Sequence, residues 1–182
     1  MGLFRARDLL LPPSLLSLAR LPLAAAFPFV HGRPWLAFAV LVTAGFSDVL
    51  DGWWARRHHQ ATSTGALVDP ITDKIFVLTV VITLVVAGDL DLVSVLLLST
   101  RELGELPLVL WLSIDRAART KRKDHPRANL PGKLATALQF AAVTAALFHL
   151  SWTPVLVYTT AVAGAVAAAV YWARELRPVR PA

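Results

Sequence analysis

Residues 48–73 read DVLDGWWARRHHQATSTGALVDPITD, and the rest of the chain is organised around this stretch. It holds four aspartates in otherwise apolar sequence, namely Asp48, Asp51, Asp69 and Asp73. On a helix, the first two share a face with Gly52 and Ala55, which are too small to block access to them. After the polar link Arg57–Thr64, Gly65 and the last two aspartates recur every four residues. An antiparallel helical hairpin would therefore aim all four carboxylates at one shared volume.

Four carboxylates in one volume repel each other unless a cation lies between them. In sequence that favours a membrane, each carboxylate also costs on the order of 2–3 kcal/mol on insertion scales, so the cluster is a functional-site hypothesis. Oxygen ligands at this charge density suit a hard divalent ion, Mg²⁺ or Mn²⁺. The alternative is that the carboxylates are protonated or pair with Arg56 and Lys74.

Composition points to a membrane protein. The chain has 182 residues, of which 56% are hydrophobic and 16% charged, with a mean hydropathy of +0.59. The apolar residues form runs long enough to cross a bilayer, which favours one all-α membrane domain over residues 1–182. The chain has no cysteine, which excludes disulfides and thiolate metal sites. Its net charge of +6 comes without an aromatic-interleaved basic motif, so we expect no nucleic-acid partner.

Apolar runs predict six transmembrane helices after a short interfacial segment, Met1–Pro12. The predicted spans are Ser14–Val30, Trp35–Ala55, Gly65–Ala87, Leu90–Ile114, Lys133–Leu150 and Pro154–Ala173. Pro28 and Pro107 fall inside these runs and are expected to kink or end their helices.

The basic residues outside the spans are distributed unequally between the two sides. Thirteen fall on the side of both termini and of the Arg116–Arg127 loop, and the other side has only Arg33. By the positive-inside rule, the termini and the aspartates lie at the cytoplasmic face of a multi-pass protein of the cell (inner) membrane. The basic loop determines topology in this interpretation, although it would also attract anionic headgroups.

The aspartate pattern resembles a known signature. Asp48-x2-Asp51-Gly52-x2-Ala55-Arg56-x8-Gly65-x3-Asp69-x3-Asp73 is similar, position for position, to that of the CDP-alcohol phosphatidyltransferase family of membrane enzymes. The resemblance implies an enzyme that transfers a phosphatidyl group from CDP-diacylglycerol to a hydroxyl acceptor and releases CMP. It also implies a homodimer. It implies that the four aspartates hold Mg²⁺ or Mn²⁺ and that Asp73 is also the general base. The residues expected to bind the CDP group are Gly52, Ala55, Arg56 and Gly65.

Two flanking segments also resemble family motifs. Residues 13–20, PSLLSLAR, are similar to a first-helix P-N-x-x-T-x-x-R, with Ser14 and Ser17 in place of Asn and Thr. Residues 132–139, GKLATALQ, are similar to the G-K-x-x-T-x-x-Q of phosphatidylglycerophosphate synthases. We expect three basic residues to converge on the acceptor phosphate, namely Arg20, Arg101 and Lys133. Alternatively, Arg20 and Lys133 extend to the membrane interface, and Arg101 pairs with Glu102 or Glu105.

These flanking motifs favour glycerol 3-phosphate as the acceptor, giving phosphatidylglycerophosphate. Residues 103–107, LGELP, lack the Ser and Arg usual in such synthases, so a cardiolipin synthase that uses phosphatidylglycerol is the alternative. From another class, a cation transporter would need polar groups toward the far face, whereas this acidic cluster is confined near one side. An inert scaffold would be expected to have lost an aspartate.

Overall fold

The computed structural model describes residues 12–57, 65–114 and 130–175, and the regular elements in these ranges are all α-helices. The chain forms two compact units, Met1–Asp89 and Leu90–Ala182. The all-α prediction is confirmed for the described residues. The interfacial segment before Pro12 and the basic loop Arg116–Arg127 lie outside them. The number of membrane spans and the single-domain organisation stay predictions.

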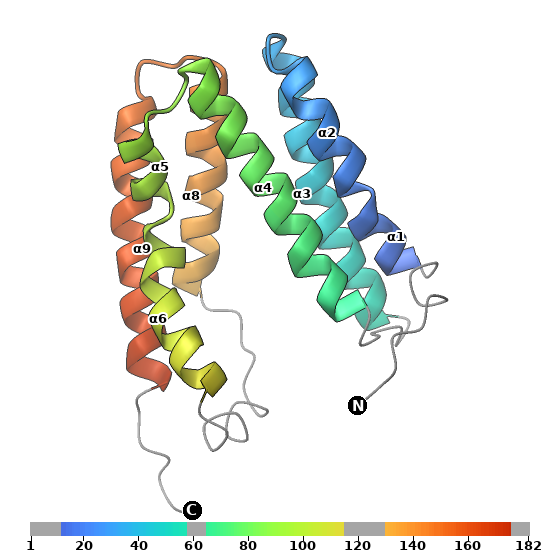
Figure 1. Ribbon diagram of the computed structural model, residues 1–182. Helices are drawn as coiled ribbons and strands as arrows, with labels where there is room; N and C mark the ends of the chain where they lie inside the picture. Colours follow the sequence, from blue (N-terminus) through green and yellow to red (C-terminus); the bar gives the residue numbers. More distant parts are fainter. Residues whose placement is uncertain (1–11, 58–64, 115–129, 176–182) are drawn as a thin grey trace, which may run out of the picture. The chain divides into compact units, whose positions relative to one another are not determined.

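The described part of the first unit contains four helices, α1 (Pro12–Leu18), α2 (Arg20–Val30), α3 (Pro34–Arg57) and α4 (Gly65–Ala87). Figure 1 shows α1 and α2 running in one direction, α3 returning and α4 running back. Helices α1 and α2 pack against both α3 and α4. Their shared core is formed by Ala24, Phe27, Ala37, Leu41, Ala44, Phe76, Val80 and Leu84. Alanine at several of these positions lets the helix backbones approach closely.

The first predicted span is two consecutive helices, because α1 ends at Leu18 and α2 begins at Arg20. Pro22 explains the interruption, since it has no N–H to donate to the Leu18 carbonyl. At the other end of α2, Nε2 of His31 contacts Oδ2 of Asp89 at 2.5 Å, directly after α4. This contact joins the far ends of α2 and α4.

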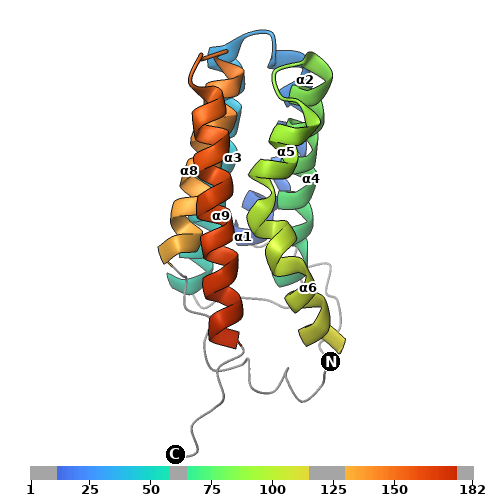
Figure 2. The ribbon, with the colours of Figure 1, turned by 90° about the vertical axis from the view of Figure 1, so that its left-hand side faces the viewer.

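The second unit contains α5 (Leu92–Leu98), α6 (Thr100–Ile114), α8 (Leu130–Leu147) and α9 (Thr153–Glu175). Figure 2 shows α8 and α9 running antiparallel side by side, and α9 also packs against α5 and α6. Asp91 caps α5, because its carboxylate accepts a hydrogen bond of 2.8 Å from the backbone N–H of Ser94.

Two predicted spans in the second unit differ from the observed helices. The fourth predicted span is divided at Ser99, and Pro107 lies inside α6 instead of ending it. Helix α8 begins and ends three residues before the predicted Lys133–Leu150. It ends where His149 adopts a left-handed φ of 50° and the N–H of Leu150 bonds to the Ala145 carbonyl at 3.0 Å. That is the geometry of a Schellman C-cap.

The outward helix faces are apolar. One side of α4 exposes large apolar side chains at helical spacing, namely Ile71, Ile75, Leu78, Ile82 and Val86. One side of α9 does the same with Val155, Tyr158, Val162 and Val166. In water such faces would be polar. Among the described residues, two helices are long and apolar enough to cross a bilayer, Leu130–Leu147 and Thr153–Arg174. The exposed apolar faces and these two helices fit a membrane environment.

Candidate active site

The aspartate pattern lies on two helices joined by a short link. Asp48 and Asp51 are in the last turns of α3, and Asp69 and Asp73 are in the first turns of α4. Both helix ends lie at the same end of the first unit (Figure 1). The helical spacing inferred from sequence is therefore confirmed for the backbone. Side-chain positions are described for Asp69 and Asp73, but not for Asp48, Asp51, Gly52, Ala55, Arg56 and Gly65.

The carboxylate of Asp69 is held by the first helix. It is half-buried, and its Oδ1 accepts a hydrogen bond from Oγ of Ser17, which is 0% exposed. A hydroxyl that donates to a carboxylate limits the rotation of that carboxylate. Asp73, one turn later on α4, is exposed. The site thus has one oriented carboxylate and one that is accessible.

The α1 helix also contacts α3. Oγ of Ser47, a buried side chain one residue before Asp48, donates to the Leu16 carbonyl at 2.8 Å. Ser17 and Arg20 are three residues apart and both are buried, so they face the interior of the unit. Arg20 is 1% exposed, so its side chain lies inside this unit, and its role toward the acceptor phosphate stays a prediction.

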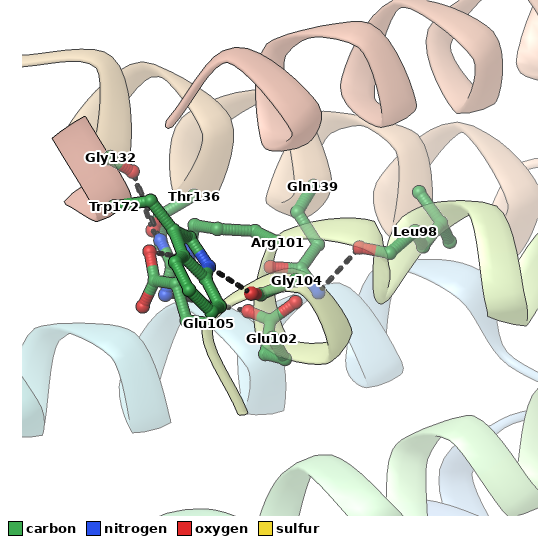
Figure 3. Close-up of polar contacts among 9 residues, drawn as sticks. All are labelled: Leu98, Arg101, Glu102, Gly104, Glu105, Gly132, Thr136, Gln139 and Trp172. Carbon is green, nitrogen blue, oxygen red and sulfur yellow. Dashed lines mark hydrogen bonds and ion pairs between the residues drawn. The ribbon is translucent and has the colours of Figure 1, made fainter. Parts of the chain in front are cut away.

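In the second unit, Arg101 is the centre of a polar cluster (Figure 3). Its Nη1 donates to the Gly132 carbonyl at 3.0 Å and to Oγ1 of Thr136 at 2.6 Å. Its Nη2 lies 3.4 Å from Oε1 of Glu102, and its Nε lies 3.9 Å from Oε1 of Glu105. The pairing of Arg101 with glutamates, considered from sequence as an alternative, is present.

One face of α8 binds the junction between α5 and α6. Gly132, Thr136 and Gln139 recur at i, i+4 and i+7, and Nε2 of Gln139 donates to the Leu98 carbonyl at 3.3 Å. Leu98 ends α5, so its carbonyl has no partner one turn later in the same helix. The motif that resembles a phosphatidylglycerophosphate synthase signature therefore holds both Arg101 and the helix end before it. Lys133, between these contacts in sequence, is exposed.

Helices α6 and α9 approach closely at two glycines. A Cβ at Gly104 would lie 2.8 Å from Cβ of Ala168, and one at Gly164 would lie 3.0 Å from the backbone N of Arg101. Nε1 of Trp172 donates to the Gly104 carbonyl at 2.8 Å. Gly164 and Ala168 of α9 therefore pack against α6, and Gly164 lies directly against the Arg101 backbone.

Replacing Gly104 with alanine is expected to lower the free energy of unfolding by about 1–3 kcal/mol, because the added methyl overlaps Ala168 and the helices must separate. Thermal unfolding in detergent measures the effect. Gly45→Ala is the matched control, since nothing lies within 4 Å of a Cβ there. Equal melting temperatures for the two variants would contradict the close contact.

Three of the predictions about this site are not tested by the described residues. Among the residues whose side chains are described, no group of three or more His, Cys, Asp or Glu gathers as a metal site, and only two of the four aspartates belong to that set. The metal site is therefore untested. The convergence of Arg20, Arg101 and Lys133 and the roles of the CDP-binding residues are untested as well. Ser17 and Thr136 are motif positions in the sequence, but no local pattern indicates their partners, Asp69 and Arg101, and none singles out Trp172.

Parts of the chain are similar to known proteins. It is 41% identical over 106 residues to a Mycobacterium tuberculosis protein provisionally named cardiolipin synthase, covering 54% of this chain and 50% of the relative. It is 35% identical over 133 residues to the Streptomyces coelicolor cardiolipin synthase (CMP-forming), covering 68% and 59%. It is 39% identical over 67 residues to a Rickettsia bellii CDP-diacylglycerol–glycerol-3-phosphate 3-phosphatidyltransferase, covering 37% of each. The chain spans about half the length of the first of these relatives.

A sequence profile covers more of the chain than any of these pairwise similarities. The profile described as CDP-alcohol phosphatidyltransferase matches residues 10–172, which include both helices of the aspartate pattern, the Arg101 cluster and most of α9. With the pattern complete on α3 and α4, this protein belongs to the CDP-alcohol phosphatidyltransferase family.

Proposed function

We propose that the protein transfers a phosphatidyl group from CDP-diacylglycerol to a hydroxyl acceptor and releases CMP. The observation that carries this proposal is the complete aspartate pattern, located on two helices whose adjoining ends lie at one end of the first unit. Membership of the family supports the same reaction. One relative is named a CMP-forming cardiolipin synthase, and another is named a phosphatidyltransferase from CDP-diacylglycerol to glycerol 3-phosphate.

The donor set fits a hard divalent cation. Asp69 and Asp73 are four residues apart on α4, Asp48 and Asp51 are three apart on α3, and all four supply carboxylate oxygen. These four residues would hold Mg²⁺ or Mn²⁺. When bound, the ion would neutralise the donor diphosphate and stabilise charge on the departing CMP. Ser17 would keep the Asp69 carboxylate in one orientation while its other lone pairs remain available.

Asp73 is the proposed general base. Its exposed carboxylate would accept the proton of the acceptor hydroxyl as that oxygen forms a bond to the phosphorus of the phosphatidyl group. The bond from the same phosphorus to the oxygen of CMP then breaks. In the last turns of α3 and at the start of α4, Gly52, Ala55 and Gly65 would leave room for the cytidine, and Arg56 would pair with phosphate oxygens.

Glycerol 3-phosphate is the proposed acceptor, with Arg101, Lys133 and Arg20 as the residues that bind its phosphate. The structural support is the half-buried guanidinium of Arg101, which is held by the α8 motif. Phosphatidylglycerol is the second candidate acceptor, and the names of two relatives favour it. Purified protein in mixed micelles with CDP-diacylglycerol and either acceptor would decide between them by CMP release and product chromatography.

Replacing Arg101 with alanine is expected to raise KM for glycerol 3-phosphate about 10–100-fold, because hydrogen bonds to a charged group contribute roughly 1.5–3 kcal/mol. KM for CDP-diacylglycerol should change by much less, and Lys133→Ala should have a smaller effect than Arg101→Ala. Arg33→Ala is the control, since Arg33 is an exposed arginine of the other unit. Wild-type protein that ignores glycerol 3-phosphate yet consumes phosphatidylglycerol would overturn this acceptor assignment.

The proposed setting is a six-helix bundle in the cell (inner) membrane, with its active site at the cytoplasmic face and a homodimer as the assembly. The apolar outward faces of α4 and α9 support embedding in lipid. The excess of basic residues on one side supports the orientation. Cysteine-accessibility labelling from both sides of sealed vesicles would test this topology, and the absence of native cysteines makes single-cysteine variants simple to interpret.

A further inference from the structure

The guanidinium of Arg101 has one nitrogen fully occupied by α8. Nη1 carries two N–H groups, and it donates to the Gly132 carbonyl at 3.0 Å and to Oγ1 of Thr136 at 2.6 Å. The Thr136 hydroxyl itself donates to the same Gly132 carbonyl at 3.1 Å. The hydroxyl hydrogen is therefore directed away from Arg101, and an oxygen lone pair faces Nη1. The three groups close a small ring of hydrogen bonds.

The opposite edge of the same guanidinium is less well satisfied. Nε is buried without a hydrogen-bond partner among the described residues, and its nearest carboxylate oxygen belongs to Glu105 at 3.9 Å. Nη2 lies 3.4 Å from a Glu102 oxygen, and the Glu102 side chain is 46% exposed. Both distances are longer than a charge-assisted hydrogen bond. The Nε–Nη2 edge is thus the part of Arg101 that a ligand anion can compete for.

The backbone of Arg101 is located by a third helix. Gly164 of α9 lies so close that a Cβ there would be 3.0 Å from the Arg101 nitrogen and 3.3 Å from its Cβ. With the backbone held by α9 and Nη1 held by α8, the flexible side chain keeps little freedom. A guanidinium fixed in this way loses less conformational entropy when it binds an anion than a freely moving one does.

We propose that Thr136 is a positioning residue for Arg101, and that its hydroxyl orients the Nε–Nη2 edge toward the phosphate of the acceptor alcohol. This inference rests on the proposed function, in which Arg101 binds that phosphate. Thr136 does not touch the acceptor in this arrangement. Its hydroxyl oxygen accepts a hydrogen bond from Nη1. That bond excludes orientations of the guanidinium in which the Nη1–Nη2 edge faces the ligand.

The test compares Thr136→Val, which keeps the shape but removes the hydroxyl, with Thr136→Ser, which retains it. Thr136→Val should raise KM for the acceptor about tenfold, because a hydrogen bond to a charged group is lost. KM for CDP-diacylglycerol should stay within about twofold, and Thr136→Ser should recover most of the acceptor affinity. Thr159→Val is the matched control, because the Thr159 hydroxyl is exposed and, among the described residues, bonds only to carbonyls of its own helix, Val155 and Leu156.

A second readout does not depend on turnover. Glycerol 3-phosphate should raise the melting temperature of wild-type protein and of Thr136→Ser by similar amounts, and that of Thr136→Val by much less. If Thr136→Val does not yield folded protein, Thr136→Ala removes the same hydroxyl without a second methyl, and the same differences are expected of it.

The outcomes separate this inference from the proposed acceptor. If wild-type protein uses only phosphatidylglycerol, the glycerol 3-phosphate assignment fails, and the KM comparison is repeated with that acceptor, whose phosphodiester is also anionic. An equal acceptor KM for Thr136→Val and Thr159→Val would overturn the positioning role with either acceptor. The positioning role would also be overturned if Thr136→Ser raised the acceptor KM as much as Thr136→Val does. Equal increases in KM for donor and acceptor in Thr136→Val would overturn it as well.

Discussion

Asp73→Asn is expected to lower kcat about 10²–10⁴-fold, the range that a positioned general base contributes. The amide has nearly the shape of the carboxylate but cannot accept the proton of the acceptor hydroxyl. Because Asp73 is exposed on α4, the substitution should leave the fold intact. CDP-diacylglycerol should still bind, which equilibrium binding of a radiolabelled donor would measure beside CMP release.

Two comparisons make that result specific to Asp73. Asp91→Asn removes another exposed carboxylate, and asparagine still caps α5, so turnover should be unchanged. Asp48→Asn and Asp51→Asn should weaken both donor binding and metal binding, because these residues are proposed as ligands and not as the base. Near-normal turnover in Asp73→Asn would be incompatible with this division of roles.

Chelation of divalent ions is expected to lower CMP release by at least about 100-fold, since charge stabilisation by a metal contributes several kcal/mol to such a transfer. Addition of Mg²⁺ or Mn²⁺ in excess over EDTA should restore the rate, which shows that the protein was not irreversibly unfolded. Titration of Mn²⁺ followed by electron paramagnetic resonance would report binding without turnover. Full activity in EDTA would remove the metal from the proposed mechanism.

The Mn²⁺ titration also tests the ligand set. Asp69→Asn should weaken Mn²⁺ binding directly, whereas Ser17→Ala should weaken it less, because Ser17 only orients the Asp69 carboxylate. The polar neighbour Thr72 offers a control. Its hydroxyl bonds to the backbone carbonyls of Val68 and Asp69 within α4, so Thr72→Val should leave Mn²⁺ affinity unchanged.

Much of the helical architecture was predictable from local sequence. Apolar runs bounded by polar or proline-containing segments correspond to helices within a few residues, and the aspartate spacing placed each pair on one helix. Both signals depend on residues close together in the chain. The interruption after Leu18 also depends on a nearby residue, because Pro22 cannot donate a hydrogen bond to the Leu18 carbonyl.

Other structural features depend on contacts between residues that are distant in sequence. The junction between α5 and α6 is held by Gln139, which lies 41 positions after the Leu98 carbonyl that it binds. Pro107 was expected to kink or end its helix, and it does not end it, because α6 continues to Ile114 and packs against α9. Local propensity gives way here to tertiary contacts.

The sequence alone determined the family and the helices that carry the aspartates, because fixed spacing on a regular helix converts directly into a shared face. Only the tertiary structure decided what the polar side chains bind. Ser17 and Asp69 lie 52 positions apart, and Arg101 and Thr136 lie 35 apart, on helices that no local pattern pairs. Those contacts form only when helices distant in sequence pack together, which is a property of the tertiary structure.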